Sequence, residues 1–485
     1  MNYMNFRNVF RVLGIIYISI GLILFIPLSI SIVNNDGAQI AFLVTVIISL
    51  ISGILFNILK TEKPDIEKKE AIAIVVIGWA SVSVLGAFPF YFSGYFPGFL
   101  DSLFESVSGF TTTGASILKD IESLPLSILF WRSLTHWLGG MGIIIFVLIV
   151  LPVVNIGTRN LYNFESSSIA QERLTPKVKD TARLLWFVYF FFTLAETILL
   201  MAEGLPFFDA LLTSFGTIPT GGFSPKNMSV AGYNSVYVEI VVMVFMVLSG
   251  INFSFYLRAL LRPEKKPSSF REIITFYLSF MFVCALIVSI DLKGRVYQTW
   301  AESIRYGFFQ VISINTTTGF VTADYEKWGP LAHIVLLVLM FIGACPGSTT
   351  GAIKNSRIVI LFKSVFREIL YFLHPRMVKS IRLNGRIVDE NTVRSAITYI
   401  GLYFCFFIFA TFLMTTQGID LRTSIFSVAT TMGGVGPGLG ITGPMANYLL
   451  LPPFCKYILI ACMLLGRLEF YAILLIFFPG FWKKF

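Results

Sequence analysis

The chain has few charged residues and few cysteines, and both shortages limit what it can be. Only 13% of its 485 residues are charged, whereas 56% are hydrophobic and 15% are aromatic. A soluble chain of this length needs a charged surface, so the composition is typical of a polytopic membrane protein. The five cysteines are scattered and form no C-x-x-C pair, so the sequence predicts neither a disulfide framework nor a zinc site.

Groups that carry enzyme chemistry are also scarce. The histidines His136, His333 and His374 share neither a metal-ligand spacing nor a paired base, and the apolar runs hold almost no convergent acidic residues. A membrane enzyme is therefore disfavoured. The net charge of +10 comes from short basic clusters between apolar runs, without the sustained basic stripe of a nucleic-acid-binding protein.

What the chain does have is a series of long apolar runs. They fall near residues 12–33, 39–59, 71–93, 127–152, 184–202, 235–257, 272–290, 331–361, 395–416 and 448–479. Since a bilayer requires about 20 apolar residues per helix, we expect an all-α protein with ten transmembrane helices. The first run lacks a convincing cleavage site and is interpreted as a retained span rather than a signal peptide.

The basic residues predict the orientation of these spans. With the N-terminus in the cytoplasm, 27 Lys and Arg residues lie in the inner segments and eight, Arg132 among them, in the outer ones. By the positive-inside rule both termini are cytoplasmic. The basic segment from Lys354 to Arg394 could also dock an acidic partner surface, and the two explanations stay open.

Four segments of the chain resemble one another. Each is a helix-compatible stretch that ends in a Thr- or Gly-rich turn, and we align them on Gly114, Gly221, Gly319 and Gly436. Ten positions earlier every copy has a bulky apolar residue: Phe104, Leu211, Phe309 and Phe426. The pattern predicts four units of span, short re-entrant helix, extended loop and span. We divide the chain into an N-terminal transmembrane hairpin at 1–64 and pore repeats at 65–155, 183–262, 270–373 and 390–482.

The four turns are candidates for an ion-selectivity filter. Irregular backbone at membrane depth is tolerated only where it is buried in protein or lines a watery cavity, and backbone carbonyls with Thr hydroxyls can replace the water shell of K⁺. One Thr-Thr-Thr-Gly turn could be an ordinary loop, but four copies in matching context favour a pore. The candidate K⁺ ligands, and the only metal site we expect, are Thr111, Thr112, Thr113, Gly114, Ile218, Pro219, Thr220, Gly221, Thr316, Thr317, Thr318, Gly319, Gly433, Gly434, Val435 and Gly436.

Further motifs give the chain a family resemblance. They are Trp-Leu-Gly-Gly-Met-Gly at 137–142, Ile-Pro-Thr-Gly-Gly-Phe-Ser at 218–224, Pro-Gly-Ser-Thr-Thr-Gly at 346–351 and Leu-Gly-Arg-Leu-Glu at 465–469. With the four loops, the whole chain resembles the Trk/Ktr/HKT superfamily of K⁺ transporters, most closely the bacterial TrkH-type subunit. The resemblance implies K⁺ uptake across the bacterial cytoplasmic membrane, a pseudo-fourfold pore, a homodimer in the lipid bilayer and a cytoplasmic nucleotide-binding partner ring of the TrkA type.

Some features separate members of this superfamily. The apolar hairpin before residue 65 favours the TrkH type over the shorter, Na⁺-dependent KtrB type, and Gly114 occupies a position where some HKT relatives have serine and pass Na⁺. TrkH relatives generally carry Asn before the last filter strip, where this chain has Gly433 and Gly434. The ligands of the fourth loop are therefore less certain, and a KtrB-like transporter or an unregulated cation channel stays an alternative.

A helix-breaking cluster interrupts the run at 331–361. It comprises Gly343, Gly347, Ser348, Thr349, Thr350 and Gly351. A nucleotide P-loop would need Gly-Lys-Ser/Thr after a strand, but Lys354 arrives three residues after Gly351, so we expect this chain to bind no nucleotide. Small polar residues on a broken segment suit a movable plug beneath the filter, as the resemblance also implies, or a packing kink between helices.

Ionisable residues near the predicted pore have competing interpretations. Arg467 lies inside the last apolar run, where it could form a positive barrier in the pore, pair with Glu469, or extend to the cytoplasmic edge. Five acidic residues precede the filter strips and could either concentrate cations or stabilise helix N-termini. They are Asp101, Glu105, Asp209, Glu302 and Asp420.

Overall fold

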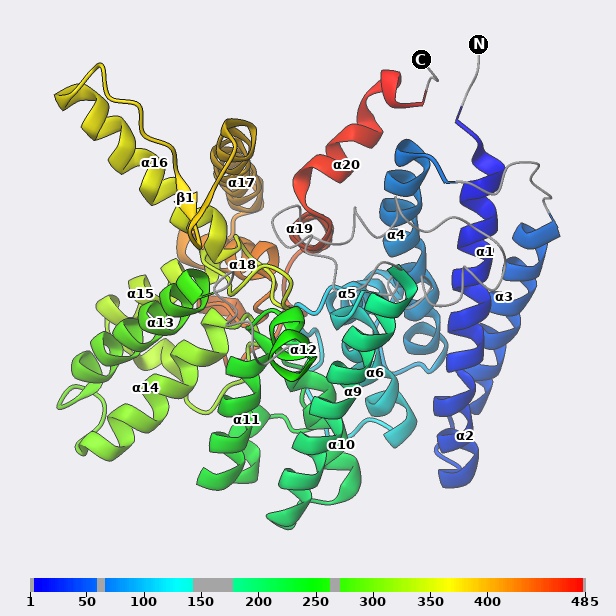
Figure 1. The fold of residues 1–485 in the computed structure, drawn as a ribbon. Helices are drawn as coiled ribbons and strands as arrows, with labels where there is room; N and C mark the ends of the chain where they lie inside the picture. The colour runs from blue at the N-terminus through cyan, green and yellow to red at the C-terminus, as the bar shows by residue number, and fades with distance from the viewer. Residues whose placement is uncertain (1–3, 59–65, 143–177, 262–270, 483–485) are drawn as a thin grey trace.

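The computed structural model describes residues 4–58, 66–142, 178–261 and 271–482, and these are almost entirely helical (Figure 1). Within these ranges the only paired strands are β1 (Arg382–Leu383) and β2 (Arg386–Ile387), a small hairpin that follows the helix α16. The predicted helical membrane protein is confirmed, with this hairpin as its one exception in the described ranges.

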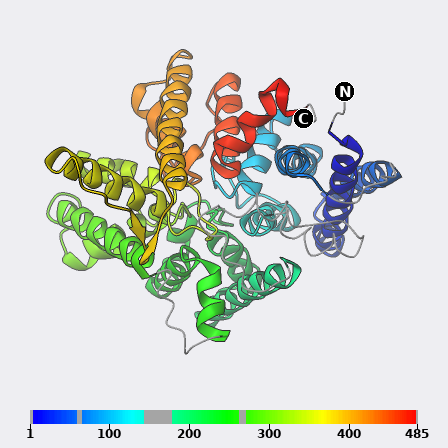
Figure 2. The ribbon, with the colours of Figure 1, turned by 45° about the horizontal axis from the view of Figure 1, so that its top comes forward.

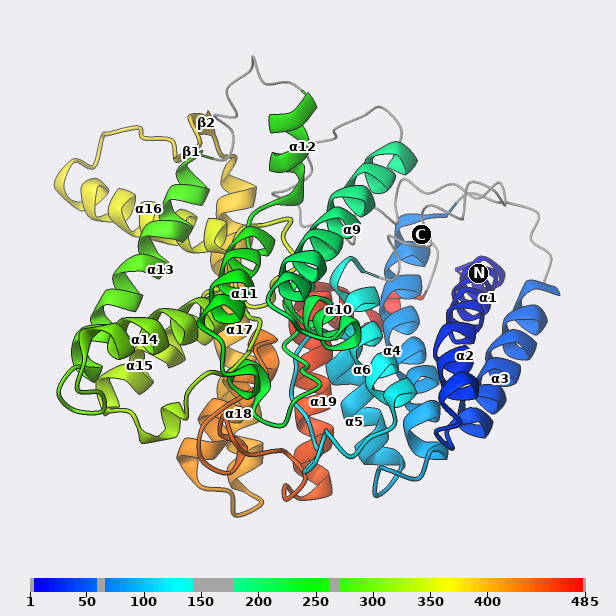
Figure 3. The same ribbon diagram turned by 90° about the horizontal axis from the view of Figure 1, so that it is seen from below.

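Three helices precede the repeats. α1 (Phe6–Ile23) and α2 (Phe25–Asn34) run almost continuously, and α3 (Gln39–Ile58) returns beside them. α1 also packs against α4 (Lys68–Phe92), so the three helices form a hairpin at the edge of the molecule (Figure 3). The turn between α2 and α3 is tied to the core because the backbone N–H of Ser127 donates to Asp36 at 3.2 Å.

The rest of the chain contains four units of the same kind. Each has a long helix, a short helix and a further helix. The first three units are α4, α5 (Phe99–Phe110) and α6 (Leu126–Gly140); α9 (Val178–Ala202), α10 (Phe207–Thr217) and α11 (Val236–Ser249); α13 (Arg271–Leu292), α14 (Trp300–Asn315) and α15 (Pro330–Phe341). The fourth is α17 (Glu390–Thr415), α18 (Leu421–Gly433) and α19 (Pro453–Leu468). Figure 2 shows the four units around a common centre, with the blue N-terminal helices outside.

Short 3₁₀ helices add turns to the connections. They are Ser229–Tyr233, Tyr325–Lys327, Gly440–Thr442 and Pro479–Phe481. The short helices α14 and α18 begin with side-chain caps: Thr299 and Glu302 form a capping box, and Asp420 accepts from the N–H of Thr423.

The long apolar runs are more interrupted than the sequence predicts. Six described helical segments are long and apolar enough to cross a membrane: Phe6–Asn34, Gln39–Ile58, Lys68–Phe92, Thr181–Ala202, Arg271–Leu292 and Glu390–Thr415. A seventh crossing is possible if α19 and α20 (Phe470–Phe477), which meet at a 113° bend, count as one. Residues 143–152 of the fourth expected run lie outside the described residues.

Two more expected spans are divided. The run at 235–257 becomes α11 and α12 (Phe253–Leu261), and the run at 331–361 becomes α15, an irregular segment and α16 (Asn355–Leu373). In the second case Pro346 lacks the N–H of a helical hydrogen bond, and the glycines around it disfavour a helical backbone. The break in the run at 331–361 is the one that the sequence predicts, whereas the break in the run at 235–257 was not expected.

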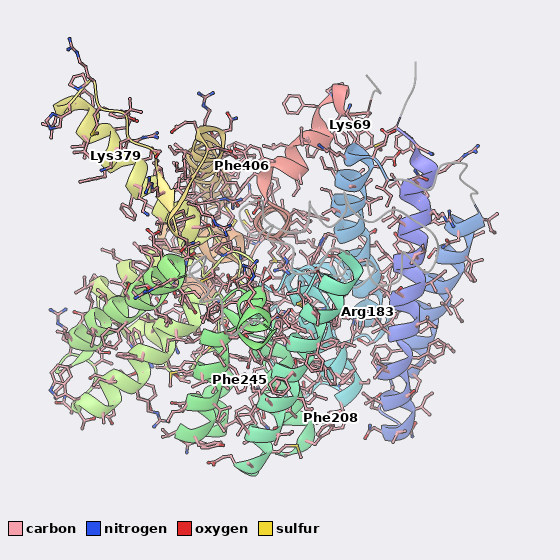
Figure 4. The ribbon with its side chains drawn as sticks, in the orientation of Figure 1. Lys69, Arg183, Phe208, Phe245, Lys379 and Phe406 are labelled. Atoms are coloured by element: carbon pink, nitrogen blue, oxygen red, sulfur yellow. The ribbon has the colours of Figure 1, made fainter. Side chains whose placement is uncertain are left out.

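α1 begins and α20 ends on the same side of the molecule (Figure 1), and the N–H of Met4 donates to the carbonyl of Trp482 at 3.4 Å. Lys69 and Lys379 lie on the same side, whereas Phe208 and Phe245 lie in the opposite half (Figure 4). Large apolar side chains such as Ile51, Phe190 and Phe282 are about half exposed on the outer helices, as expected for surfaces in contact with lipid.

Candidate ion pathway

The turns that follow the four short helices share one backbone conformation. Thr112, Thr220 and Thr317 have positive φ angles of 56°, 56° and 54°, a region that threonine rarely adopts, and Gly434 has 69°. Two residues later each turn has a glycine at positive φ: Gly114, Gly222, Gly319 and Gly436, at 79°, 82°, 78° and 102°. Four turns of the same form, three of them with a strained threonine, are structural evidence for a repeated functional element.

Hydrogen bonds fix how the four turns correspond. In each, a backbone N–H donates to the carbonyl five residues earlier, at 2.8–2.9 Å. The donors are Thr113, Gly221, Thr318 and Val435. The second strip is therefore Pro219–Gly222, and the alignment on Gly221 is wrong by one residue. Gly222 is the counterpart of Gly114.

The correction extends to the helix before the second strip. In the structural alignment the counterpart of Phe104 is Leu212, which is 1% exposed, rather than the partly buried Leu211. Ile218 comes before the strip, at the position of Phe110 at the end of α5. The sequence alone could not choose between the adjacent glycines 221 and 222.

The four strips form a closed ring. A Cβ atom placed on Gly114 would lie 2.1 Å from the carbonyl oxygen of Gly221, and one on Gly222 would lie 2.0 Å from that of Thr318. The ring continues from Gly319 to the carbonyl of Val435, at 1.7 Å, and from Gly436 to that of Thr113, at 2.6 Å. In each strip the glycine, which has no Cβ, leaves space for a carbonyl oxygen of the next strip. The contacts run from the first strip to the second, third and fourth, and back to the first.

This ring has the chemistry of a cation pathway. The glycines are required both by positive φ and by the missing space for Cβ. Each short helix ends where its strip begins, so four helix C-termini, with their partial negative charge, meet at the ring. Carbonyl oxygens of four strips close together can replace the water shell of a dehydrated cation.

The strips are chemically unequal. In the first, the hydroxyls of Thr111 and Thr113 are 2.8 Å apart, and in the third those of Thr316 and Thr318 are also 2.8 Å apart. The second and fourth strips lack this pair of hydroxyls. We call a strip braced when it has this pair of hydroxyls. The first and third strips lie opposite each other in the ring and are braced, and the second and fourth lie opposite each other and are not.

The irregular segment between α15 and α16 lies against the strips. The N–H of Gly351 donates to the Thr317 hydroxyl at 2.8 Å, and the hydroxyls of Thr349 and Thr220 are 3.3 Å apart. A Cβ on Gly351 would lie 2.2 Å from the carbonyl oxygen of Gly433. The segment therefore contacts the second, third and fourth strips at once, which a simple packing kink would not require.

Other contacts hold this segment in place. Asn252, in the break between α11 and α12, donates to the carbonyl of Pro346 at 2.8 Å. Asn315, the last residue of α14, donates to the carbonyl of Ile342 at 3.0 Å, and Lys354 donates to the Thr350 hydroxyl at 3.1 Å. Gly343, Gly347 and Ser348 lie in the same segment, and the Ser348 hydroxyl is 2.8 Å from that of Thr350.

Arg467 completes the contact with the first strip. Its guanidinium donates to the Thr112 hydroxyl at 3.4 Å, to the Thr349 carbonyl at 3.1 Å and to the carbonyls of Gly139 and Gly140 at the end of α6. The equivalent hydroxyls of Thr112, Thr220 and Thr317 are therefore each engaged by Arg467 or by the segment. A positive charge at this position opposes a cation in the ring.

Glu469 pairs with Arg357. Its two carboxylate oxygens each accept from Arg357, at 2.9 Å, and the Arg357 guanidinium lies 3.9 Å from the centre of the Tyr399 ring. The structure therefore gives Glu469 a cationic partner other than Arg467. Glu469 instead connects the α19–α20 bend to the first turn of α16.

A buried network supports the outside of the first two strips. Arg132 pairs with Glu105 at 2.7 Å, and the two side chains are 2% and 0% exposed. The Arg132 guanidinium lies 3.6 Å from the centre of the Phe223 ring, whose other neighbour is His136, with ring centres 3.9 Å apart. His136 Nδ1 lies 2.7 Å from the Gly109 carbonyl and so carries the proton in this contact.

This network corrects two expectations. Glu105 does not lie at an open outer mouth, because Arg132, Ser116 and the N–H of Ile117 surround its carboxylate. Arg132 belongs to a buried helix rather than to an outer loop. Sequence reasoning missed both partners because Glu105 and Arg132 are 27 residues apart.

The other acidic residues before the strips have helix-end or ion-pair roles. Asp101 and Asp209 lie in the first turns of α5 and α10, where they pair with Lys456 and Lys226. Glu302 belongs to a capping box and Asp420 is an N-cap. These contacts favour the stabilisation of helix N-termini over the concentration of cations.

Comparisons with known proteins agree with this geometry. The family model described as TrkH, a cation transport protein, matches residues 38–484. The chain is 35% identical to the Trk system potassium uptake protein TrkH of Salmonella typhimurium and 34% identical to that of Escherichia coli, in each case over 99% of this chain and 100% of the relative. It is also 32% identical to the Trk system potassium uptake protein TrkG of E. coli, over the full length of both.

A solved structure has the same fold. The crystal structure of the potassium transporter TrkH from Vibrio parahaemolyticus superposes with a TM-score of 0.87 at 29% identity, covering 99% of this chain and 100% of that one. The similarity therefore includes the N-terminal hairpin as well as the four units.

Proposed function

This chain belongs to the TrkH family of cation transport proteins, and from that premise we propose that it takes up K⁺ across the bacterial cytoplasmic membrane through its ring of four strips. It is a multi-pass membrane transporter and not an enzyme. The relatives named for potassium uptake match it over nearly their whole length, which supports K⁺ as the transported ion.

The closed ring of glycine-to-carbonyl contacts is the observation that carries this proposal. Four strips in contact around one centre can present several oxygen ligands to one dehydrated ion. The proposed ligands are Thr111–Gly114, Pro219–Gly222, Thr316–Gly319 and Gly433–Gly436, and Ile218 is no longer among them.

The segment from Gly343 to Gly351 is proposed as the gate, with Arg467 as an electrostatic barrier. Three hydroxyls at one level of the ring bond to these groups, and the fourth strip has only Gly434 there. An ion leaving the ring on this side would need those hydrogen bonds to break. Control of this movement by a cytoplasmic nucleotide-binding partner ring of the TrkA type is part of the proposal.

The proposed architecture follows the same family. We propose ten spans, with both termini cytoplasmic, divided into a hairpin at 1–64 and pore units at 65–155, 183–262, 270–373 and 390–482. Two such chains would form a homodimer in the bilayer. The start of α1, the end of α20, Lys69 and Lys379 lie on one side of the molecule, which supports the orientation.

Complementation tests the transport function. A bacterium that lacks its own K⁺ uptake systems should grow on low K⁺ when it expresses this chain. Gly319→Ser should remove the preference for K⁺ over Na⁺, because its side chain would meet the Val435 carbonyl. Gly294→Ser is the matched control, since Gly294 also has positive φ, at 80°, but nothing lies within 4 Å of its Cβ position.

The results separate the alternatives. Unchanged selectivity in Gly319→Ser would show that the strips do not form the ion pathway. K⁺ uptake by the purified chain in liposomes, measured with and without Na⁺ and proton gradients, distinguishes a channel from a KtrB-like coupled transporter. Flux that needs no added cytoplasmic partner would favour an unregulated channel.

A further inference from the structure

The 113° bend between α19 and α20 lies two residues after Arg467. Its central residue, Glu469, has a φ of 58° and a ψ of 143°. Glycine is the usual residue in this conformation, because a Cβ makes it costly. A glutamate stays in such a conformation only where its surroundings hold it there, so contacts from other helices must maintain the bend.

The first of these contacts comes from α16. One terminal nitrogen of the Arg357 guanidinium lies 2.9 Å from both carboxylate oxygens of Glu469. Arg357 is 8% exposed, and the Tyr399 ring of α17 covers its guanidinium at 3.9 Å. A guanidinium that is held by a ring and by a carboxylate has little freedom to move, so Arg357 fixes the position of Glu469.

The residue after the bend is anchored by α17. Phe470, the first residue of α20, is 0% exposed. Its ring centre lies 5.7, 5.5 and 5.2 Å from those of Tyr399, Tyr403 and Phe406. α16, α17 and α20 all lie on one side of the molecule (Figure 1). The ion pair and this aromatic cluster together turn the chain away from the axis of α19.

The bend matters for the ion pathway because Arg467 belongs to the last turn of α19. Its guanidinium reaches the Thr349 and Gly140 carbonyls, each at 3.1 Å, and the Thr112 hydroxyl at 3.4 Å. The last turn of a helix lacks partners for its carbonyls and frays easily. Bonds from one side chain to three separate elements therefore require that the end of α19 be fixed from outside, and Glu469 provides this attachment.

We propose that Arg357 and Glu469 are positioning residues for Arg467. Their ion pair fixes the end of α19 so that Arg467 stays against the ring, and separation of the pair lets Arg467 withdraw. The inference rests on the proposed function, in which Arg467 is a barrier to cations.

The same pair connects the barrier to the proposed gate outside the ring. Arg357 comes six residues after Gly351, and its N–H donates to the carbonyl of Lys354 at 2.9 Å. A movement of the gate that shifts the start of α16 therefore also pulls on Glu469. The segment and Arg467 would leave the ring in one step rather than independently.

K⁺ flux through the purified full-length chain in liposomes, without an added partner, tests the inference. Glu469→Gln removes the charge of the pair and keeps the shape of the side chain. The double variant Arg357→Met/Glu469→Gln removes both partners, so that no buried charge is left unpaired. Arg467→Ala removes the barrier, and Arg467→Ala/Glu469→Gln shows whether Glu469 acts through Arg467.

A matched control lies on the same two helices. Glu390 of α17 accepts from Arg367 of α16 at 3.1 Å. Arg367 is ten residues beyond Arg357, which is about 15 Å further along the helix. Glu390→Gln therefore breaks an ion pair between α16 and α17 without touching the bend.

We expect Glu469→Gln and Arg357→Met/Glu469→Gln to raise the flux about tenfold or more, the scale of hydrogen bonds to a charged group. Glu390→Gln should stay close to wild type. Arg467→Ala should raise the flux at least as much as Glu469→Gln does. Adding Glu469→Gln to Arg467→Ala should then change it by less than about twofold, since two changes that act through one group are not additive.

Three results would overturn the inference. The first is flux at or below the wild-type level in Arg357→Met/Glu469→Gln, which would show that the link is dispensable. The second is a larger rise when Glu469→Gln is added to Arg467→Ala, since Glu469 would then act through the gate. The third is an equal rise in Glu390→Gln. Unchanged flux in Arg467→Ala would instead refute the proposed barrier, and the inference with it.

Discussion

At the scale of the residue, Gly222 is where the corrected alignment has its sharpest consequence. The atom that obstructs a Cβ at Gly222 belongs to the backbone of Thr318, whereas the obstruction at Gly221 is the ring of His136, 2.4 Å away. A side chain can be removed by mutation and a backbone cannot. The two neighbouring glycines can therefore be told apart experimentally.

We predict that Gly222→Ala abolishes K⁺-selective growth. Gly221→Ala should also impair growth, but a second change, His136→Ala, should restore part of it by removing the obstructing ring. Growth on low K⁺ and Na⁺ inhibition of uptake are the measurements. Normal selectivity in Gly222→Ala would indicate that Gly221, and not Gly222, is the counterpart of Gly114.

The buried pair of Glu105 and Arg132 gives a prediction about stability. Glu105→Gln leaves the Arg132 guanidinium buried without its counter-charge, and loss of one partner of a buried pair costs about 3–5 kcal/mol. Unfolding of the purified protein in detergent should reveal this loss. The control Asp324→Asn breaks a more exposed pair with Lys327, at 3.2 Å, and should change the free energy of unfolding by about 1 kcal/mol or less. Equal effects of the two variants would contradict the prediction.

Sequence patterns identified most strip residues but not the groups behind them. The glycines and threonines could be found because they recur four times at similar spacing. Glu105, Arg132 and His136 occur once each, so no repeat marks them. A charged residue in an apolar run was a usable signal for Arg467.

At the scale of the element, the segment between α15 and α16 determines whether the ring is open. We predict that deletion of Gly347–Gly351 raises basal K⁺ flux, because it removes the hydrogen bonds to Thr317 and Thr220. Flux is measured in liposomes with equal amounts of each protein. Unaltered or lost flux in a normally folded deletion variant would show that the segment does not block the pathway.

The helix breaks were only partly predictable. Pro346 and its neighbouring glycines mark the break after α15, and Gly250 precedes the break between α11 and α12. The 113° bend at the end of α19 has no such marker: Glu469 adopts a φ of 58°, unusual for glutamate, at the residue that Arg357 holds by two hydrogen bonds. Arg357 and Glu469 are 112 residues apart, so the cause of this bend is tertiary.

At the scale of the whole molecule, Asp36 connects the N-terminal hairpin to the first pore unit. Partial burial alone would raise the pKa of Asp36, but hydrogen bonds from Ser127, Ser31 and Ala38 outweigh burial and hold the pKa below its ordinary value. A depressed pKa means that the ionised form is favoured in the folded state. The stabilisation is present above the ordinary pKa and is lost as the pH falls through the folded pKa.

We therefore predict an acid-dependent attachment of the hairpin. Between pH values of about 5 and 3, around and below the ordinary pKa of aspartate, the unfolding temperature of the wild type should fall more than that of Asp36→Asn. Thermal unfolding of both proteins over this range is the measurement. Parallel curves would mean that Asp36 does not contribute in this way.

The arrangement of units was more predictable than their contacts. Apolar runs and the fourfold repeat indicated a membrane protein with four similar units. Contacts between units, such as Arg305 with Glu239 at 2.7 Å and Arg422 with Glu326 at 3.0 Å, join residues distant in the chain and follow only from the fold.

The presence of all four strips on one polypeptide has a consequence for stoichiometry. Four identical subunits around one axis would bring four copies of Arg467 and four blocking segments into a space that holds one of each here, and the like charges would repel. A single chain with four different strips has no such symmetry constraint. One unit can carry the arginine and another the segment, and the fourth strip can have a glycine, Gly434, where it lies close to Gly351. Because the four strips differ in sequence, one segment and one arginine are enough to block a ring of four strips.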